Sequence, residues 1–267
     1  MAAQGRFAFD LPEATLAIAR NTVLEAVREK VLYLLAGFAL FACAASRVLA
    51  PLALGEGRRV TIDIGLAGLS LFGLLLIVFV GHSLVYRELE RGSAAFLFSR
   101  PLGRGSFVTG KFLGLAAVLA GAVAGMGIVL FLVLVLSGYE VGAVFAGAIA
   151  LVLLELWVLA ALAILFAALA SPILAGLFVA GAFLIGNAAG SLTQLGQLFP
   201  QGGAGALSRA LLWIVPRFDL FQAAPAVVHG GRIAPEQWLF SVCYAALYAT
   251  GALLLARVAF ARRSLVG

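Results

Sequence analysis

The sequence predicts an all-α membrane protein with six transmembrane helices, and three observations lead to that fold class. Hydrophobic residues make up 64% of the 267 residues and charged residues only 11%, whereas soluble domains are roughly 45–50% apolar and about 25% charged. Six apolar stretches are long enough to cross a hydrocarbon core about 30 Å thick, which takes roughly 20 helical residues. The arginines flank these stretches and do not form basic blocks with aromatics, so the net charge of +6 does not indicate a nucleic-acid partner.

The first predicted element is an amphipathic helix over residues 11–30. Asp10 and Pro12 are helix-start signals, and apolar residues such as Leu16 and Val23 recur with helical spacing among charged ones. We expect this helix to lie along the inner membrane surface before the chain turns into the first span. A polar extension of the first span is the alternative.

The six predicted spans follow in order along the chain. They comprise residues 31–54, 64–85, 112–137, 141–170, 172–190 and 238–260. The fourth is longer than a helix perpendicular to the membrane requires, so we expect it to be tilted or broken. Cys43 and Cys243 fall inside apolar stretches, which indicates small buried side chains and neither a disulfide nor a metal site.

Between the fifth and sixth spans lies the long external segment 191–237. Glycines interrupt it, residues 206–215 have the pattern of a short amphipathic helix, and Pro216 ends that helix. Irregular backbone cannot face lipid, because its polar groups would have no partners. We therefore interpret the segment as an outer gate or lid, with a plain connecting loop as the alternative.

The distribution of basic residues predicts the orientation in the membrane. Twelve of the 18 lysines and arginines lie before the first span, between the second and third spans, or at the C-terminal end, and six lie toward the other side of the membrane. Because positively charged loops are retained in the cytoplasm, we expect both termini and the segment 86–111 to be cytoplasmic.

Charge, glycine and proline are concentrated in that segment, 86–111. It opens with charged residues that extend the second span into water, namely Arg87, Glu88, Glu90 and Arg91. Gly92 and Ser93 then permit a reversal of the chain. An apolar patch over residues 94–98 follows, too short to span and bounded by Pro101. We expect it to form a short amphipathic helix across the inner surface.

The same segment contains a partial phosphate-binding motif. Residues 105–111 supply G-x-x-x-x-G-K, but Phe112 stands where a serine or threonine would ligate magnesium, and the residues after it enter a span. We therefore expect no ATP site, cofactor or catalytic residue in this chain, and any ATP-derived energy must come from a separate protein.

The order of residues in 86–111 resembles the E-x-G-[TS]…P-x-[SG]-R…G-K-x-x-G pattern of type-2 ABC transporter permeases. The matching residues are Glu88 or Glu90, Arg91, Gly92, Ser93, Pro101, Arg104, Gly110, Lys111 and Gly114. The chain looks most similar to permeases of nitrous-oxide-reductase copper-site maturation and related bacterial exporters. It departs from many of them in having Gly103 where they have serine.

The resemblance implies the transmembrane subunit of an ATP-driven exporter in a bacterial inner membrane. ATP and magnesium would be bound by separate ATPase subunits, and a second permease subunit, identical or not, would complete the substrate pathway. The residues it assigns to ATPase coupling are Glu88, Glu90, Arg91, Gly92, Ser93, Phe96, Leu97, Pro101, Arg104 and Lys111. Phe96 or Leu97 would be the apolar anchor. Alternatively, the basic residues are cytoplasmic charges beside anionic lipid.

Two polar residues inside predicted spans are candidates for the substrate path. Glu155 lies near the middle of the fourth span, where a charge is costly and indicates function, and Asn187 lies toward the outer end of the fifth. A structural, protonated or snorkelling glutamate is the alternative. An intramembrane enzyme or a channel without an energy source remains a rival interpretation, although no metal-ligand or nucleophile constellation is visible. Gly121, Gly125 and Gly127 could let helices of two permease subunits approach closely.

Overall fold

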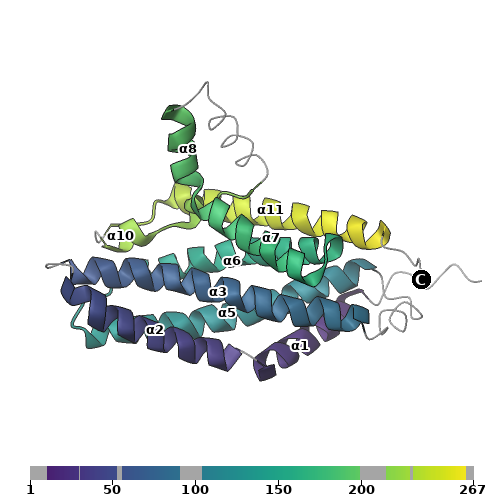
Figure 1. The fold of residues 1–267 in the computed structure, drawn as a ribbon, viewed down its shortest axis with the longest axis horizontal. Helices are drawn as coiled ribbons and strands as arrows, with labels where there is room; N and C mark the ends of the chain where they lie inside the picture. The colour runs from purple at the N-terminus through teal and green to yellow at the C-terminus, as the bar shows by residue number, and fades with distance from the viewer. Residues whose placement is uncertain are drawn as a thin grey trace, which may run out of the picture.

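The computed structural model describes residues 11–29, 31–52, 56–90, 104–198, 215–228 and 231–262. These residues form helices and connecting turns and contain no strand, in agreement with the predicted all-α class. The elements in chain order are α1 (Leu11–Glu29), α2 (Val31–Leu52), α3 (Gly57–Glu90), α5 (Arg104–Leu136), α6 (Val144–Leu169), α7 (Pro172–Asn187), α8 (Ala189–Leu198), the 3₁₀-helix η1 (Phe218–Phe221), α10 (Ala224–Val228) and α11 (Pro235–Arg262). The long helices lie side by side in an elongated bundle (Figure 1).

Four helices in the described part of the chain are long and apolar enough to cross a membrane. Their apolar stretches are Gly57–Phe79 in α3, Ser106–Leu136 in α5, Val144–Leu169 in α6 and Pro235–Phe260 in α11. The other two predicted spans correspond to α2 and α7. Within the part of the chain that the structure describes, their apolar stretches are Tyr33–Val48 and Pro172–Asn187. With 16 residues, α7 rises about 24 Å, which is less than the roughly 30 Å of hydrocarbon.

The helices do not begin and end where the apolar stretches do. α3 begins at Gly57, before the predicted start at 64, and α5 begins at Arg104, before 112. Charged residues continue a helix readily when they face water, and Arg59 and Asp63 form an ion pair of 3.8 Å within α3. α7 ends at Asn187, earlier than the predicted 190, and α8 then projects away from the bundle (Figure 1).

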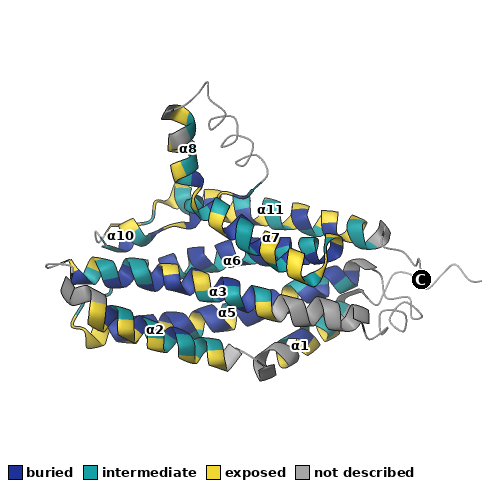
Figure 2. Ribbon diagram, in the orientation of Figure 1, coloured by how far each residue is buried: buried dark blue, intermediate teal, exposed yellow. Residues whose placement is uncertain are grey.

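The core lies between α3, α5 and α6. Leu69 and Leu119 are fully buried there, together with Leu156. Gly73 of α3 leaves room for the Leu156 side chain of α6, whose methyl groups occupy the space that a Cβ would need. Buried residues follow the inward faces and exposed residues the outward ones (Figure 2). Since the outward faces are also apolar, they suit contact with lipid.

The expectation that both cysteines are buried is wrong. Cys43 on α2 and Cys243 on α11 are exposed. A lipid-facing position of a membrane helix is as apolar as a buried one, so the hydrophobic surroundings in the sequence could not distinguish the two. Gly125 and Gly127 approach Leu35 and Ile149 of the same chain, so these glycines serve packing within one subunit.

α1 packs against the beginning of α5. A Cβ at Gly110 would lie 3.0 Å from the Thr15 carbonyl oxygen, and one at Gly114 would lie 2.9 Å from the Ala19 carbonyl oxygen. The two glycines therefore let the backbones of α1 and α5 approach closely. The opposite face of α1 exposes Leu16, an arrangement compatible with the predicted interfacial position.

Candidate functional site

The residues predicted to couple to an ATPase lie at the end of α3, at the beginning of α5, and in residues 91–103 between them. Glu88 and Glu90 belong to the last turns of α3, and Arg104 is the first residue of α5. The C-terminal ends of α3 and α11 lie at the same end of the bundle, beside α1 (Figure 1). The remaining predicted contacts lie outside the described residues, and these are Arg91, Gly92, Ser93, Phe96, Leu97 and Pro101.

Lys111 lies inside the bundle. Its side chain is only 3% exposed, and its Nζ atom lies 5.9 Å from the centroid of the Phe107 ring. Its expected part in ATPase coupling stays a prediction.

Glu155, a candidate for the substrate path, is the centre of a buried polar cluster. It lies in α6 and is 3% exposed. Ser70 Oγ of α3 donates a hydrogen bond of 3.0 Å to Glu155 Oε2, and Asn187 Nδ2 of α7 donates one of 2.9 Å to Oε1. The cluster therefore joins three helices, and in the described part of the chain no cation is among the hydrogen-bond partners of Glu155.

Asn187 connects this cluster to the surface. Its Nδ2 group also donates to the Phe183 carbonyl oxygen at 3.1 Å, and its Oδ1 accepts a hydrogen bond of 3.3 Å from Gln222 Nε2. Gln222 is exposed. A continuous series of hydrogen bonds thus runs from Gln222 through Asn187 and Glu155 to Ser70. Such a series can accept hydrogen bonds from another polar group, and the Glu155 carboxyl can hold a proton.

Residues 215–228 pack against the end of α7, and we call them the covering segment. Phe218 and Phe221 of η1 are buried in the main core. Gly186 makes room for the Phe218 ring, and a Cβ there would lie 2.6 Å from the Pro216 carbonyl oxygen. The covering segment is therefore packed into the bundle, where it occupies the place that a longer α7 would take.

Two arginines stabilise the covering segment. Arg58 of α3 donates hydrogen bonds to the carbonyl oxygens of Val228 at 2.8 Å and Val227 at 3.2 Å, at the C-terminal end of α10. Arg217 forms an ion pair of 2.8 Å with Asp219, and the hydrogen bond to Asp219 raises the pKa of the Arg217 guanidinium above its usual value. Whether this segment opens as a gate stays a prediction, and the helix predicted over 206–215 lies outside the described residues apart from its last residue.

Glu155 and Asn187 were each predicted from the sequence, and the structure brings them into contact. Ser70 and Gln222 were not predicted. Ser70 gave a weak signal, because a lone serine in an apolar helix can bond to a carbonyl of its own helix. Gln222 gave none, since its proximity to Asn187 depends on how the covering segment folds back. Among the described residues, no three metal-ligating side chains lie together.

Residues 14–265 match the sequence profile of the family described as ABC-2 family transporter protein. The match covers nearly the whole chain. The chain belongs to the ABC-2 transporter family. No curated protein sequence matches it.

Membership in the ABC-2 family establishes the general role of the bundle. ABC-2 proteins are multi-pass transmembrane subunits of ABC transporters, which associate with ABC ATPases. The matched region includes α3 and α5, the two helices that flank residues 91–103, and it also includes Glu155, Asn187 and the covering segment.

Proposed function

We propose that this chain is the transmembrane subunit of an ATP-driven exporter in a bacterial inner membrane. It performs no ATP chemistry itself: ATP and magnesium bind to a separate ATPase subunit. A second permease subunit, identical or not, completes the substrate pathway. The single observation that carries the proposal is the ABC-2 match over 14–265, which includes the helices on both sides of 91–103.

Coupling takes place at the end of α3 and in residues 91–103. Glu90, Arg91 and Phe96 supply charges and an aromatic anchor of the kind that dominates protein interfaces. α3 and α5 both reach into the core, so a force on these residues acts on the centre of the bundle. The basic residues predict that residues 91–103 lie on the cytoplasmic side, where an ATPase would bind.

Co-purification tests the coupling. The chain is expressed with the ATPase encoded beside it, and the complex is isolated through the permease. We expect wild type to retain the ATPase. We expect Phe96→Ala, and likewise the double variant Glu90→Ala with Arg91→Ala, to lose ATP-dependent transport while still inserting into the membrane. Arg47→Ala, an exposed arginine on α2 at the opposite side by the charge count, is the matched control. Unchanged coupling in the Phe96 and Glu90–Arg91 variants, or ion conduction without nucleotide, would contradict the proposal.

The polar cluster borders the substrate path. Three helices meet at Glu155, and the partly exposed Asn187 links it to Gln222 on the surface. A polar group that costs free energy in the middle of a bundle suits a path that admits substrate during the transport cycle. Such a path would favour substrates that carry hydrogen-bond donors or positive charge.

Thiol labelling tests whether the cluster becomes accessible. In a background in which Cys43 and Cys243 are alanine, Ser70→Cys is expected to react with a membrane-impermeant thiol reagent only while the ATPase turns over. Leu69→Cys, the adjacent fully buried position, is the control and should stay unreactive. Absence of labelling at position 70 in every nucleotide state would argue against a substrate path there.

The proposed subgroup is that of the copper-site maturation permeases and related exporters. Its support is the Gly92–Gly114 pattern of the sequence, in which Gly103 is the departure. The genes encoded next to this one test it: a copper-binding or periplasmic maturation protein beside the ATPase gene is expected, and a polysaccharide-synthesis neighbourhood would refute the subgroup but not the exporter.

A further inference from the structure

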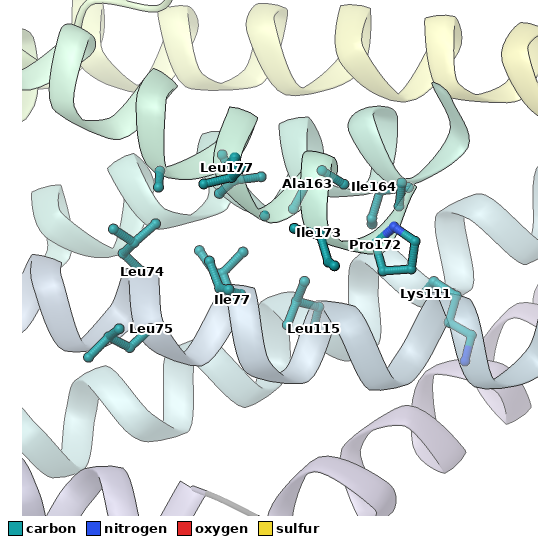
Figure 3. A pocket seen from close by; sticks show the side chains of 16 residues that line it. Leu74, Leu75, Ile77, Lys111, Leu115, Ala163, Ile164, Pro172, Ile173 and Leu177 are labelled. Atoms are coloured by element: carbon teal, nitrogen blue, oxygen red, sulfur yellow. The ribbon is translucent and has the colours of Figure 1, made fainter. Parts of the chain in front are cut away.

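An apolar pocket of about 370 Å³ lies between α3, α5, α6 and α7, away from the polar cluster. Its lining includes Leu74 and Ile77 of α3, Leu115 of α5 and Leu177 of α7 (Figure 3). Among the described residues that line it, Lys111 is the charged one. The volume falls in the range of roughly 300–1,000 Å³ that is typical of small-molecule sites.

The pocket is elongated along the bundle. Its lining runs from Leu74 toward Pro172 and Lys111 (Figure 3), and the α7 residues that line it, 172–180, cover about 12 Å of helix. Beside it, Ile173 and Leu177 are largely exposed, by 76% and 62%. Both line the pocket and reach the surface of α7, so the pocket lies open toward the lipid that surrounds a multi-pass protein. Water in such a site would lose hydrogen bonds, and a hydrocarbon chain would not.

Lys111 gives the pocket a polar end. In Figure 3 the side chain lies beyond Pro172, and its amine nitrogen points away from the apolar centre. This is the end of the bundle where α7 begins and where the basic residues predict the inner membrane surface. A lysine ammonium has three N–H donors, so it can serve an anionic group in addition to the neighbouring Phe107 ring.

We propose that the pocket binds one acyl chain of an anionic phospholipid from the inner leaflet. The chain lies lengthwise between α3 and α7, and the phosphate lies at Lys111. The lipid thereby fills the gap beside the short helix α7 and holds it at a fixed distance from α3. This inference requires a membrane protein but neither an ATPase nor a transported substrate.

Photo-crosslinking in lipid nanodiscs tests the proposal. The probe is phosphatidylglycerol with a photoactivatable diazirine near the end of one acyl chain, diluted into phosphatidylcholine, and labelled peptides are mapped by mass spectrometry. We expect labels on 74–78 and 173–180. Even labelling of all outward faces, including the exposed apolar face of α11, would overturn the proposal, because it would show ordinary surrounding lipid.

A filled pocket provides the matched variant. A Cβ at Gly176 would point at Val78 across the pocket at 3.5 Å, whereas one at Gly181 on the same helix would meet open space. Gly176→Leu should lower labelling of the pocket peptides about tenfold by overpacking the site, and Gly181→Leu should leave it unchanged. Equal labelling in the two variants would overturn the proposal.

The headgroup is tested by exchanging the lipid and the lysine. The phosphatidylglycerol probe should label wild type about fivefold more than a phosphatidylcholine probe that carries the same diazirine chain, given one lysine near the headgroup. Lys111→Arg should keep this preference and Lys111→Gln should abolish it. Equal labelling by both probes in wild type would refute the anionic headgroup. Because no ATPase is present, failure here leaves the exporter proposal intact. Conversely, unchanged ATPase coupling in the Phe96 and Glu90–Arg91 variants would contradict the exporter proposal and leave the lipid site intact.

Discussion

Replacing Asn187 by leucine tests the polar cluster most directly, because the two side chains are similar in size. Asn187→Leu removes the 2.9 Å hydrogen bond to Glu155 and the 3.3 Å hydrogen bond from Gln222. Hydrogen bonds between membrane helices contribute about 0.6 kcal/mol on average and up to about 1.7. A buried polar group left without a partner costs about 1–3 kcal/mol. We therefore expect the free energy of unfolding to fall by about 1–3 kcal/mol, or about 5- to 150-fold in the equilibrium constant.

A double-mutant cycle separates this interaction from general damage. Unfolding of Asn187→Leu, Glu155→Leu and the double variant is followed by circular dichroism during SDS titration of mixed micelles. If the pair interacts, the double variant loses less than the two single losses together, with a coupling energy of about 0.5–3 kcal/mol. Gln194→Leu, at an exposed position of α8, controls for added hydrophobicity. Single losses that add within about 0.3–0.5 kcal/mol would refute the contact.

Three further predictions concern packing and capping. Gly73→Val should lower the free energy of unfolding by about 1–3 kcal/mol through overpacking, whereas Gly121→Val, which meets open space, should leave the thermal unfolding temperature unchanged. Gly114→Val should detach α1 from α5 and speed proteolysis within α1, and equal cleavage in Gly121→Val would contradict the close approach. Arg58→Met should accelerate amide exchange in α10, since charge-assisted hydrogen bonds contribute about 1.5–3 kcal/mol. Arg59→Met, which removes only an exposed ion pair, should not, because such pairs contribute about 0–1 kcal/mol.

The helical membrane fold could be predicted because the length of an apolar stretch is a local property of the sequence. Glu155 and Asn187 could be selected for the same reason: each interrupts an apolar stretch. Their mutual contact could not be predicted, since it depends on α7 ending at the depth of the middle of α6. That end is set by packing, because Gly186 gives way to Phe218 of the covering segment.

Hydropathy could not distinguish a full span from a short helix followed by a turn. Residues 172–190 are apolar apart from Asn187, yet α7 ends at that residue and α8 leaves the bundle. The burial of Lys111 could not be predicted either, because a lysine at the end of a segment predicted to be cytoplasmic is expected to face water. Its burial follows from the start of α5 at Arg104, which places Lys111 about two turns inside a helix that packs against α1.

The first turns of α5 combine a tight contact with a loose one, and this contrast bears on how force from an ATPase would be distributed. On one side, Gly110 and Gly114 bring α5 so close to α1 that their backbones cannot slide without collision. On the other, Lys111 and Leu115 border a pocket of about 370 Å³ next to α7. A displacement of residues 91–103 would therefore move α5 and α1 together, and the relative motion would be taken up between α5 and α7. α7 carries Asn187 at its end, so motion at the pocket would act on the hydrogen bond to Glu155.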